Sequence, residues 1–244
     1  MVVFLFLIAL IYSSAGFGGG SMYLSLLSQV FPGASWIRFP ALACNFSVSA
    51  IGSFNFQRAH LIPYRPLAYL LCVSVPLAMW SASLKIPAYW FLCILGIAIF
   101  LSGLAMLFET KNSLSDLTQV KNPWWMYPIV AAIGVLSGIT GIGGGIYLAP
   151  ILHRIQWASV KQIAATTSTF ICINSLASLI ALSRNGLRWE PEYFAWIVAV
   201  LLGGFVGSRC SIRLFRPKQV KVVTAIILMF VGIKLLFDWW NQGS

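Results

Sequence analysis

Acidic residues are scarce in this chain of 244 residues. Five aspartates and glutamates stand against sixteen lysines and arginines, and charged residues together make up 9% of the sequence. A soluble domain carries about 25% charged residues. A chain that is 59% hydrophobic, with a mean hydropathy of +0.88, is therefore predicted to be an integral membrane protein. No apolar stretch has an acidic residue at its centre, so the sequence offers no carboxylate proton relay and no sodium site.

Sequence motifs of enzymes and of metal sites are also missing. The chain contains no H-E-x-x-H, no G-x-S-x-G and no P-loop motif. Its two histidines, His60 and His153, have no partners at metal-ligand spacing, and its five cysteines form no C-x-x-C pair. We therefore expect neither an enzyme nor a metal or cofactor site.

The net charge of +11 does not indicate a nucleic-acid-binding protein. The lysines and arginines stand singly or in short clusters between apolar segments, whereas nucleic-acid-binding domains gather them on one face. In a membrane protein such loop residues set the orientation of the chain. The expected partners are the lipid bilayer and a small anionic substrate, with no nucleic acid, and a homo-oligomer is compatible with the composition.

Hydrophobic segments account for most of the length. They cover residues 2–31, 38–56, 66–84, 88–108, 125–152, 160–183, 193–213 and 219–240. A helix needs about 20 apolar residues to cross the bilayer core, and most of these segments have that length. The first and fifth segments are divided by glycine clusters into shorter pieces, so the sequence predicts an all-α membrane protein with two interrupted helices.

The glycine cluster occurs twice, half the chain apart. Residues 16–20 read Gly-Phe-Gly-Gly-Gly, residues 141–145 read Gly-Ile-Gly-Gly-Gly, and a Tyr-Leu pair follows each cluster. Repetition at matching places indicates an internal duplication. We predict two homologous repeats of four hydrophobic segments each, with boundaries at 1–108 for the first, 109–124 for a polar linker and 125–244 for the second.

Two arrangements of the repeats follow from the positions of the arginines and lysines. Either all eight segments cross the membrane, or the two glycine-broken segments are re-entrant. The re-entrant arrangement gathers more basic loop residues on one side, as cytoplasmic loops require. It leaves an odd number of crossings per half, which makes the repeats inverted. We favour this arrangement, and both place the two termini outside.

Glycine-broken helices in a membrane predict a binding site. A helix that begins inside the bilayer presents free N–H groups and the positive end of its dipole, which attract an anion. Polar residues near the start of the following helices would complete the site. The predicted substrate-binding residues are Gly18, Gly19, Gly20, Asn45, Gly143, Gly144, Gly145, Thr166, Thr167 and Ser168. The alternatives are close helix packing for the glycines and helix–helix hydrogen bonding for the hydroxyls.

The doubled motif resembles the TauE/SafE family, the sulfite and sulfonate exporter group. Residues 16–20, 141–145, 164–168 and 184–186 carry this resemblance, which extends over the whole chain. It implies the transport of a sulfur-containing anion across the bacterial inner membrane. One departure is that residues 42–45 read Leu-Ala-Cys-Asn, whereas residues 165–168 read Ala-Thr-Thr-Ser. The hydroxyl-rich sequence is thus present in one half, and two equal half-sites are not expected.

The sequence therefore predicts a multi-pass secondary transporter of the bacterial inner membrane. Its substrate would be sulfite, thiosulfate or an organosulfonate, bound near the midplane between the two glycine breaks. Two alternatives stay open, namely a structural or assembly subunit of a membrane complex and an anion channel.

Overall fold

The computed structural model describes residues 1–14, 18–31, 35–84, 87–107, 123–184, 190–211 and 217–243. Within these ranges the secondary structure is entirely helical, as expected for a helical membrane protein. Residues 109–122 of the predicted linker lie outside the described residues, as do Gly16 and Phe17 of the first glycine cluster and Gly186 of the 184–186 motif.

Helices follow one another in an order that matches the hydrophobic segments. The elements of the first half are α1 (Val2–Ser14), α2 (Gly20–Val30), the short η1 (Ser35–Ile37), α3 (Arg38–Arg58), α4 (Tyr64–Ala82) and α5 (Ala88–Leu107). Those of the second half are α6 (Met126–Thr140), α7 (Gly145–Arg154), α8 (Val160–Ser183), α9 (Glu192–Ser211) and α10 (Pro217–Gly243).

The glycine clusters separate α1 from α2 and α6 from α7. These four helices have 13, 11, 15 and 10 residues, whereas about 20 are needed to cross the bilayer. The backbone turns at left-handed glycines, with φ of 85° at Gly19, 75° at Gly141, 80° at Gly143 and 77° at Gly144. Residues with a Cβ avoid this region, so the local sequence determines where each helix is interrupted.

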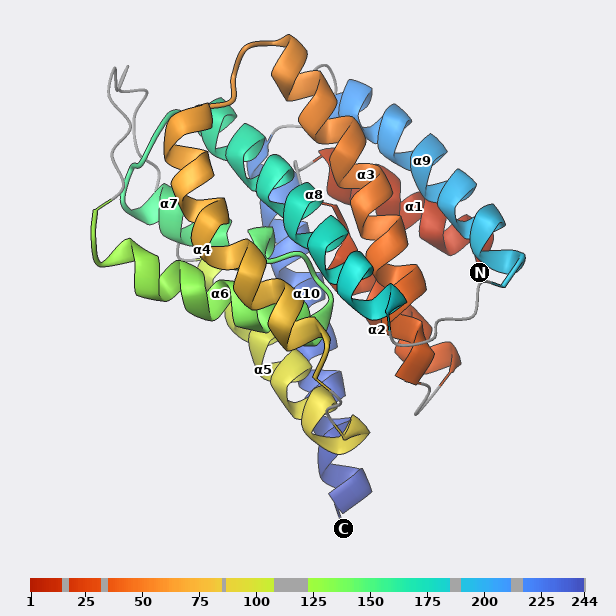
Figure 1. The fold of residues 1–244 in the computed structure, drawn as a ribbon. Helices are drawn as coiled ribbons and strands as arrows, with labels where there is room; N and C mark the ends of the chain where they lie inside the picture. The colour runs from red at the N-terminus through yellow and green to blue at the C-terminus, as the bar shows by residue number, and fades with distance from the viewer. Residues whose placement is uncertain are drawn as a thin grey trace.

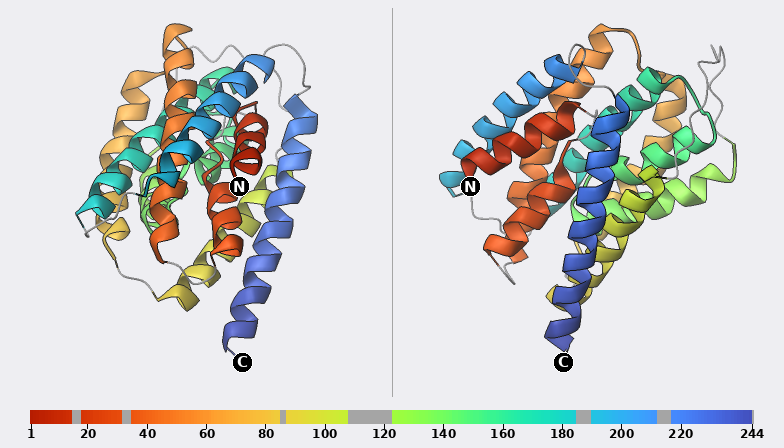
Figure 2. Two further views of the ribbon diagram at one scale, coloured as in Figure 1. Left: turned by 90° about the vertical axis from the view of Figure 1, so that its right-hand side faces the viewer. Right: turned by 180° about the vertical axis from the view of Figure 1, so that it is seen from behind.

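The arrangement of the helices is built around α3 and α8 (Figure 1). These two helices lie side by side and run in opposite directions, and so do α5 and α10. Helix α1 contacts α9, and α4 contacts α6. In Figure 2, α10 runs past α5 toward the C-terminus at one end of the molecule. The two interrupted segments begin α2 and α7 close to the α3–α8 pair.

Small residues allow the outer helices to approach closely. A Cβ added to Gly134 of α6 would lie 2.7 Å from the backbone oxygen of Ser74 on α4. At the α1–α9 contact, the glycines are instead on α9, where a Cβ at Gly203 would overlap the carbonyl of Phe6. Close approach of backbones is a typical means of joining helices in lipid, where the hydrophobic effect between them is absent.

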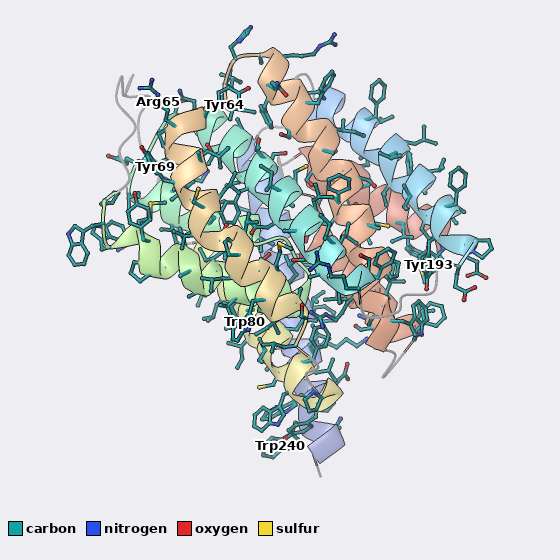
Figure 3. The ribbon with its side chains drawn as sticks, in the orientation of Figure 1. Tyr64, Arg65, Tyr69, Trp80, Tyr193 and Trp240 are labelled. Atoms are coloured by element: carbon teal, nitrogen blue, oxygen red, sulfur yellow. The ribbon has the colours of Figure 1, made fainter. Side chains whose placement is uncertain are left out.

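The outer surface carries large apolar side chains. Phe4, Phe194 and Phe230 are 62%, 66% and 69% exposed, which is unfavourable in water and expected in contact with lipid tails. Of the described helices, α4 and residues 161–183 of α8 are long and apolar enough to span a bilayer. Figure 3 shows Tyr64 at the opposite end of α4 from Trp80, and amphipathic rings of this kind gather at both membrane interfaces.

Candidate binding site at the two glycine breaks

Two helices begin at glycines inside the fold. Gly19 precedes α2 and Gly144 precedes α7, and these N-cap glycines have no side chain that could accept a hydrogen bond from the helix. The first N–H groups of an α-helix have no partner within the helix, and serine, threonine or aspartate usually supplies one. Both starts therefore direct donors and a positive dipole end at whatever lies in front of them.

Asn45 of α3 connects the two breaks. Its side-chain oxygen accepts a hydrogen bond of 3.0 Å from the N–H of Gly20, the first residue of α2. Its amide nitrogen donates to the carbonyl oxygen of Ile142 at 3.0 Å and to the hydroxyl of Ser175 on α8 at 2.9 Å. The side chain is fully buried. One amide thus joins the start of α2 to the second break and to α8.

A small cavity lies at this junction. It has a volume of about 10 Å³ and is lined by Tyr12, Gly18, Gly19, Gly20, Ser21, Asn45, Ile142, Ile146 and Ile171. A volume of this size holds about one water molecule. Its polar wall comes from the first break and Asn45, whereas isoleucines of the second break and of α8 form the apolar wall.

Two hydroxyl groups, those of Tyr12 and Ser21, are buried at the cavity. Tyr12 and Ser21 are each 1% exposed, and among the described residues neither oxygen has a hydrogen bond of acceptable geometry. The two side chains lie close enough for a poorly aligned hydrogen bond to each other. A buried hydroxyl without a well-formed hydrogen bond costs about 1–3 kcal/mol, so a ligand oxygen that bonds to either group would be stabilised here. The cavity lining has no acidic residue, and its hydroxyl and backbone N–H groups can donate to a bound anion.

Asn45 packs so closely against the first break that only glycine fits beside it. A Cβ at Gly18 would overlap the side-chain oxygen of Asn45, and one at Gly20 would lie 2.7 Å from its Cγ. The second break is also tightly enclosed. A Cβ at Gly143 would lie 2.8 Å from the Asn45 amide nitrogen, one at Gly144 would lie 3.0 Å from Ile133 and Phe170, and one at Gly145 would overlap Ile171.

The predicted site residues therefore divide into two groups. Gly18, Gly19, Gly20 and Asn45 line the cavity together. Gly143, Gly144 and Gly145 are not part of its lining but pack against neighbouring side chains, and the second break reaches the cavity through Ile142 and Ile146. The glycines of that break have the contacts expected for close packing of helices.

The predicted hydroxyl residues of α8 lie away from the cavity lining. Thr167 donates to the carbonyl of Ile163 in its own helix at 3.0 Å, and Ser168 donates to the carbonyl of Ser49 on α3 at 3.3 Å. Thr166 is fully buried, and its hydroxyl has no partner among the described residues. Thr167 and Ser168 thus make the helix hydrogen bonds that were the alternative to ligand binding.

Tyr12, Ser21 and Ser175 belong to the junction but were not predicted from the sequence. Ser21 directly follows the first glycine cluster, and this position could have indicated it. Tyr12 lies in an apolar run, and Ser175 lies well beyond the hydroxyl-rich residues 166–169. Nothing in their local sequence distinguishes them, because their positions depend on how α1 and α8 are rotated.

Comparison with known proteins agrees with this architecture. The family model described as Sulfite exporter TauE/SafE matches residues 1–235. The chain belongs to this family. The resemblance found in the glycine motifs is thereby confirmed, and the chain is a membrane transporter rather than an enzyme.

Full-length relatives carry transporter names. The chain is 30% identical over 243 residues to a probable membrane transporter protein of Sinorhizobium fredii, which covers 97% of both chains. It is 21% identical over 253 residues to a probable membrane transporter protein of Methanocaldococcus jannaschii, covering 97% of this chain and 94% of the relative. A sulfite exporter TauE/SafE family protein of Arabidopsis thaliana is 28% identical over 180 residues, 63% of this chain and 39% of the plant protein. No solved structure matches the chain.

Proposed function

We propose that this transporter moves a small sulfur-containing oxyanion, such as sulfite, thiosulfate or an organosulfonate, and binds it between the two glycine breaks. The observation that carries the proposal is the junction at Asn45. There the start of α2, two unsatisfied hydroxyls and a buried amide surround one cavity. The family description names sulfite, and an oxyanion supplies the acceptors that these donors lack.

The binding groups in the proposed site are neutral. Hydroxyl and backbone N–H donors, together with a helix start equivalent to about half a positive charge, stabilise an anion without a permanent ion pair. A transporter needs binding of this moderate kind, because the substrate must leave on the other side. The apolar wall of Ile142, Ile146 and Ile171 excludes water and strengthens each polar contact.

In this conformation the Asn45 side chain occupies the position proposed for the substrate. An anion oxygen at the start of α2 would accept the Gly20 N–H bond that the Asn45 oxygen now accepts. A cavity of about 10 Å³ is too small for a group with three oxygens, so binding requires the Asn45 side chain to move. That movement breaks its bonds to Ile142 and Ser175. Substrate binding and separation of the two breaks are coupled through one side chain.

The helix contacts support two inverted repeats, residues 1–108 and 125–244. If α1–α5 are matched in order with α6–α10, the contact between α1 and α9 corresponds to the contact between α6 and α4. The contact between α3 and α9 likewise corresponds to that between α8 and α4, and all four contacts are present. The equivalent helices α3 and α8 run in opposite directions. Transporters built this way rock one part against another around a site at the repeat interface. The inner-membrane location with both termini outside is part of the same proposal.

Reconstitution tests this function directly. The purified protein in liposomes is expected to take up sulfite with saturable kinetics, and an excess of thiosulfate or an organosulfonate should compete. Flux that rises linearly with sulfite concentration would indicate a channel. A protein that is inert alone and moves sulfite after a partner protein is added would indicate an assembly subunit.

A further inference from the structure

Arg38 is a cation with no carboxylate partner among the residues that the structure describes. It is the first residue of α3 and is half-buried. One terminal nitrogen donates to the carbonyl of Gly138 on α6 at 2.6 Å, and the guanidinium lies 5.7 Å from the centroid of Phe91 on α5. Its Nε is buried and has no acceptor among the described residues. No described acidic group influences it.

This arrangement is unfavourable for the protein alone. A partly desolvated guanidinium needs a compensating charge or a full set of acceptors, and Arg38 has one carbonyl. Carboxylates are rare in the whole chain, which has five acidic residues against sixteen basic ones. An anion from outside the protein would supply both the negative charge and the missing acceptor.

Arg38 lies on the same helix as the cavity residue Asn45. Arg38 and Asn45 are seven residues apart on α3, which is about two helical turns and places them on the same face. Both side chains hold the same segment of the second half. Arg38 binds the carbonyl of Gly138, and Asn45 binds that of Ile142 four residues later. The guanidinium is thus held beside the end of α6, about two helical turns along α3 from Asn45.

We propose that Arg38 forms an outer anion-binding subsite, which receives a small oxyanion before it passes to the cavity at Asn45. The inference rests on the proposed function. The Nε–H and a neighbouring terminal N–H form a planar pair of donors that matches two oxygens of a sulfite or sulfonate group. The side chain as a whole is partly exposed, and the Phe91 ring lies against the guanidinium.

The described residues of the second half contain no equivalent subsite at the start of α8. Lys161, near the start of α8, is the basic residue in the corresponding position, and it is exposed. An exposed ammonium binds anions weakly because water and salt screen it. Of Arg38 and Lys161, the partly buried cation is therefore Arg38, at the start of α3.

Kinetics of sulfite uptake in liposomes test this subsite, with Lys161→Gln as the matched control. Arg38→Gln is expected to raise KM at least about tenfold, because one charge-assisted hydrogen bond to the anion is lost. The change in kcat should be much smaller. Added potassium chloride should raise the KM of the wild type more than that of Arg38→Gln. Lys161→Gln should keep the wild-type KM.

Other outcomes separate the two proposals. A wild-type protein that moves no sulfite contradicts the proposed function. If the wild type moves sulfite and Arg38→Gln has an unchanged KM and salt dependence, the proposed subsite is wrong. If Arg38→Gln does not fold, Arg38→Lys decides, because lysine keeps the charge and can reach Gly138 but lacks the paired donors. It should raise KM, and a wild-type KM would assign Arg38 to capping α6 alone.

Discussion

Replacement of Asn45 by leucine tests the junction most directly. The two side chains are similar in size, but leucine removes three hydrogen bonds of 2.9–3.0 Å. The Ser175 hydroxyl can still donate a hydrogen bond to a carbonyl of its own helix. The Gly20 N–H and the Ile142 carbonyl remain buried without a partner. Two such groups cost about 2–6 kcal/mol of unfolding free energy, which lowers the unfolding midpoint by roughly 5–20 °C for a chain of this size.

The transport effect of Asn45→Leu should exceed its effect on stability. A leucine side chain cannot provide a hydrogen-bonding space for an anion at the start of α2. Sulfite uptake is therefore expected to fall at least about tenfold, even at temperatures where the variant is fully folded. Uptake per folded molecule in liposomes, with thermal unfolding in detergent measured in parallel, separates the two effects.

Asn174→Leu is the matched control for this prediction. Asn174 is equally buried and donates to Ser74 at 3.1 Å and to the Phe170 carbonyl at 3.0 Å, but it does not line the cavity. It should lose about 1 kcal/mol of stability and keep near-normal uptake. Equal uptake in the two leucine variants would refute the assignment of Asn45 to the binding site.

The remaining predictions concern other residues near the junction. Tyr12→Phe should raise the KM for sulfite about fivefold, which corresponds to a loss of roughly 1 kcal/mol. It should not lower the unfolding midpoint, because the hydroxyl makes no well-formed hydrogen bond with the described residues; a lower midpoint would show a structural bond instead. Gly20→Ala should stop uptake, because its Cβ would lie 2.7 Å from the Asn45 Cγ, whereas Gly204→Ala, 3.1 Å from Val48, should retain it in the same assay. Ser168→Ala should leave uptake unchanged, because its hydroxyl is bonded to the Ser49 carbonyl; a raised KM would return Ser168 to the site.

The glycine breaks show how far local sequence can predict this protein. Left-handed φ values at Gly19, Gly141, Gly143 and Gly144 interrupt the helices inside the clusters that the sequence singled out, because a backbone without Cβ adopts this region freely. The composition also predicted the helical membrane class, since apolar segments long enough to span a bilayer are recognisable without any tertiary information. Asn45 was predicted as a site residue because it is a polar residue near the start of an apolar helix; the structure places it at the cavity, and its role in binding stays a prediction.

The partners of each polar group were decided by the tertiary structure. Asn45 reaches Ile142, 97 residues away, and Tyr12 joins the cavity from an apolar run. Thr167 and Ser168, which have the same chemistry as a ligand-binding pair, bond instead to helix carbonyls. The sequence by itself determined the class of protein, the helices and their interruptions, because these depend on the properties of neighbouring residues. Which hydroxyls remain free to bind a ligand depends on the rotation and contact of helices far apart in the chain, and only the packed structure contains that information.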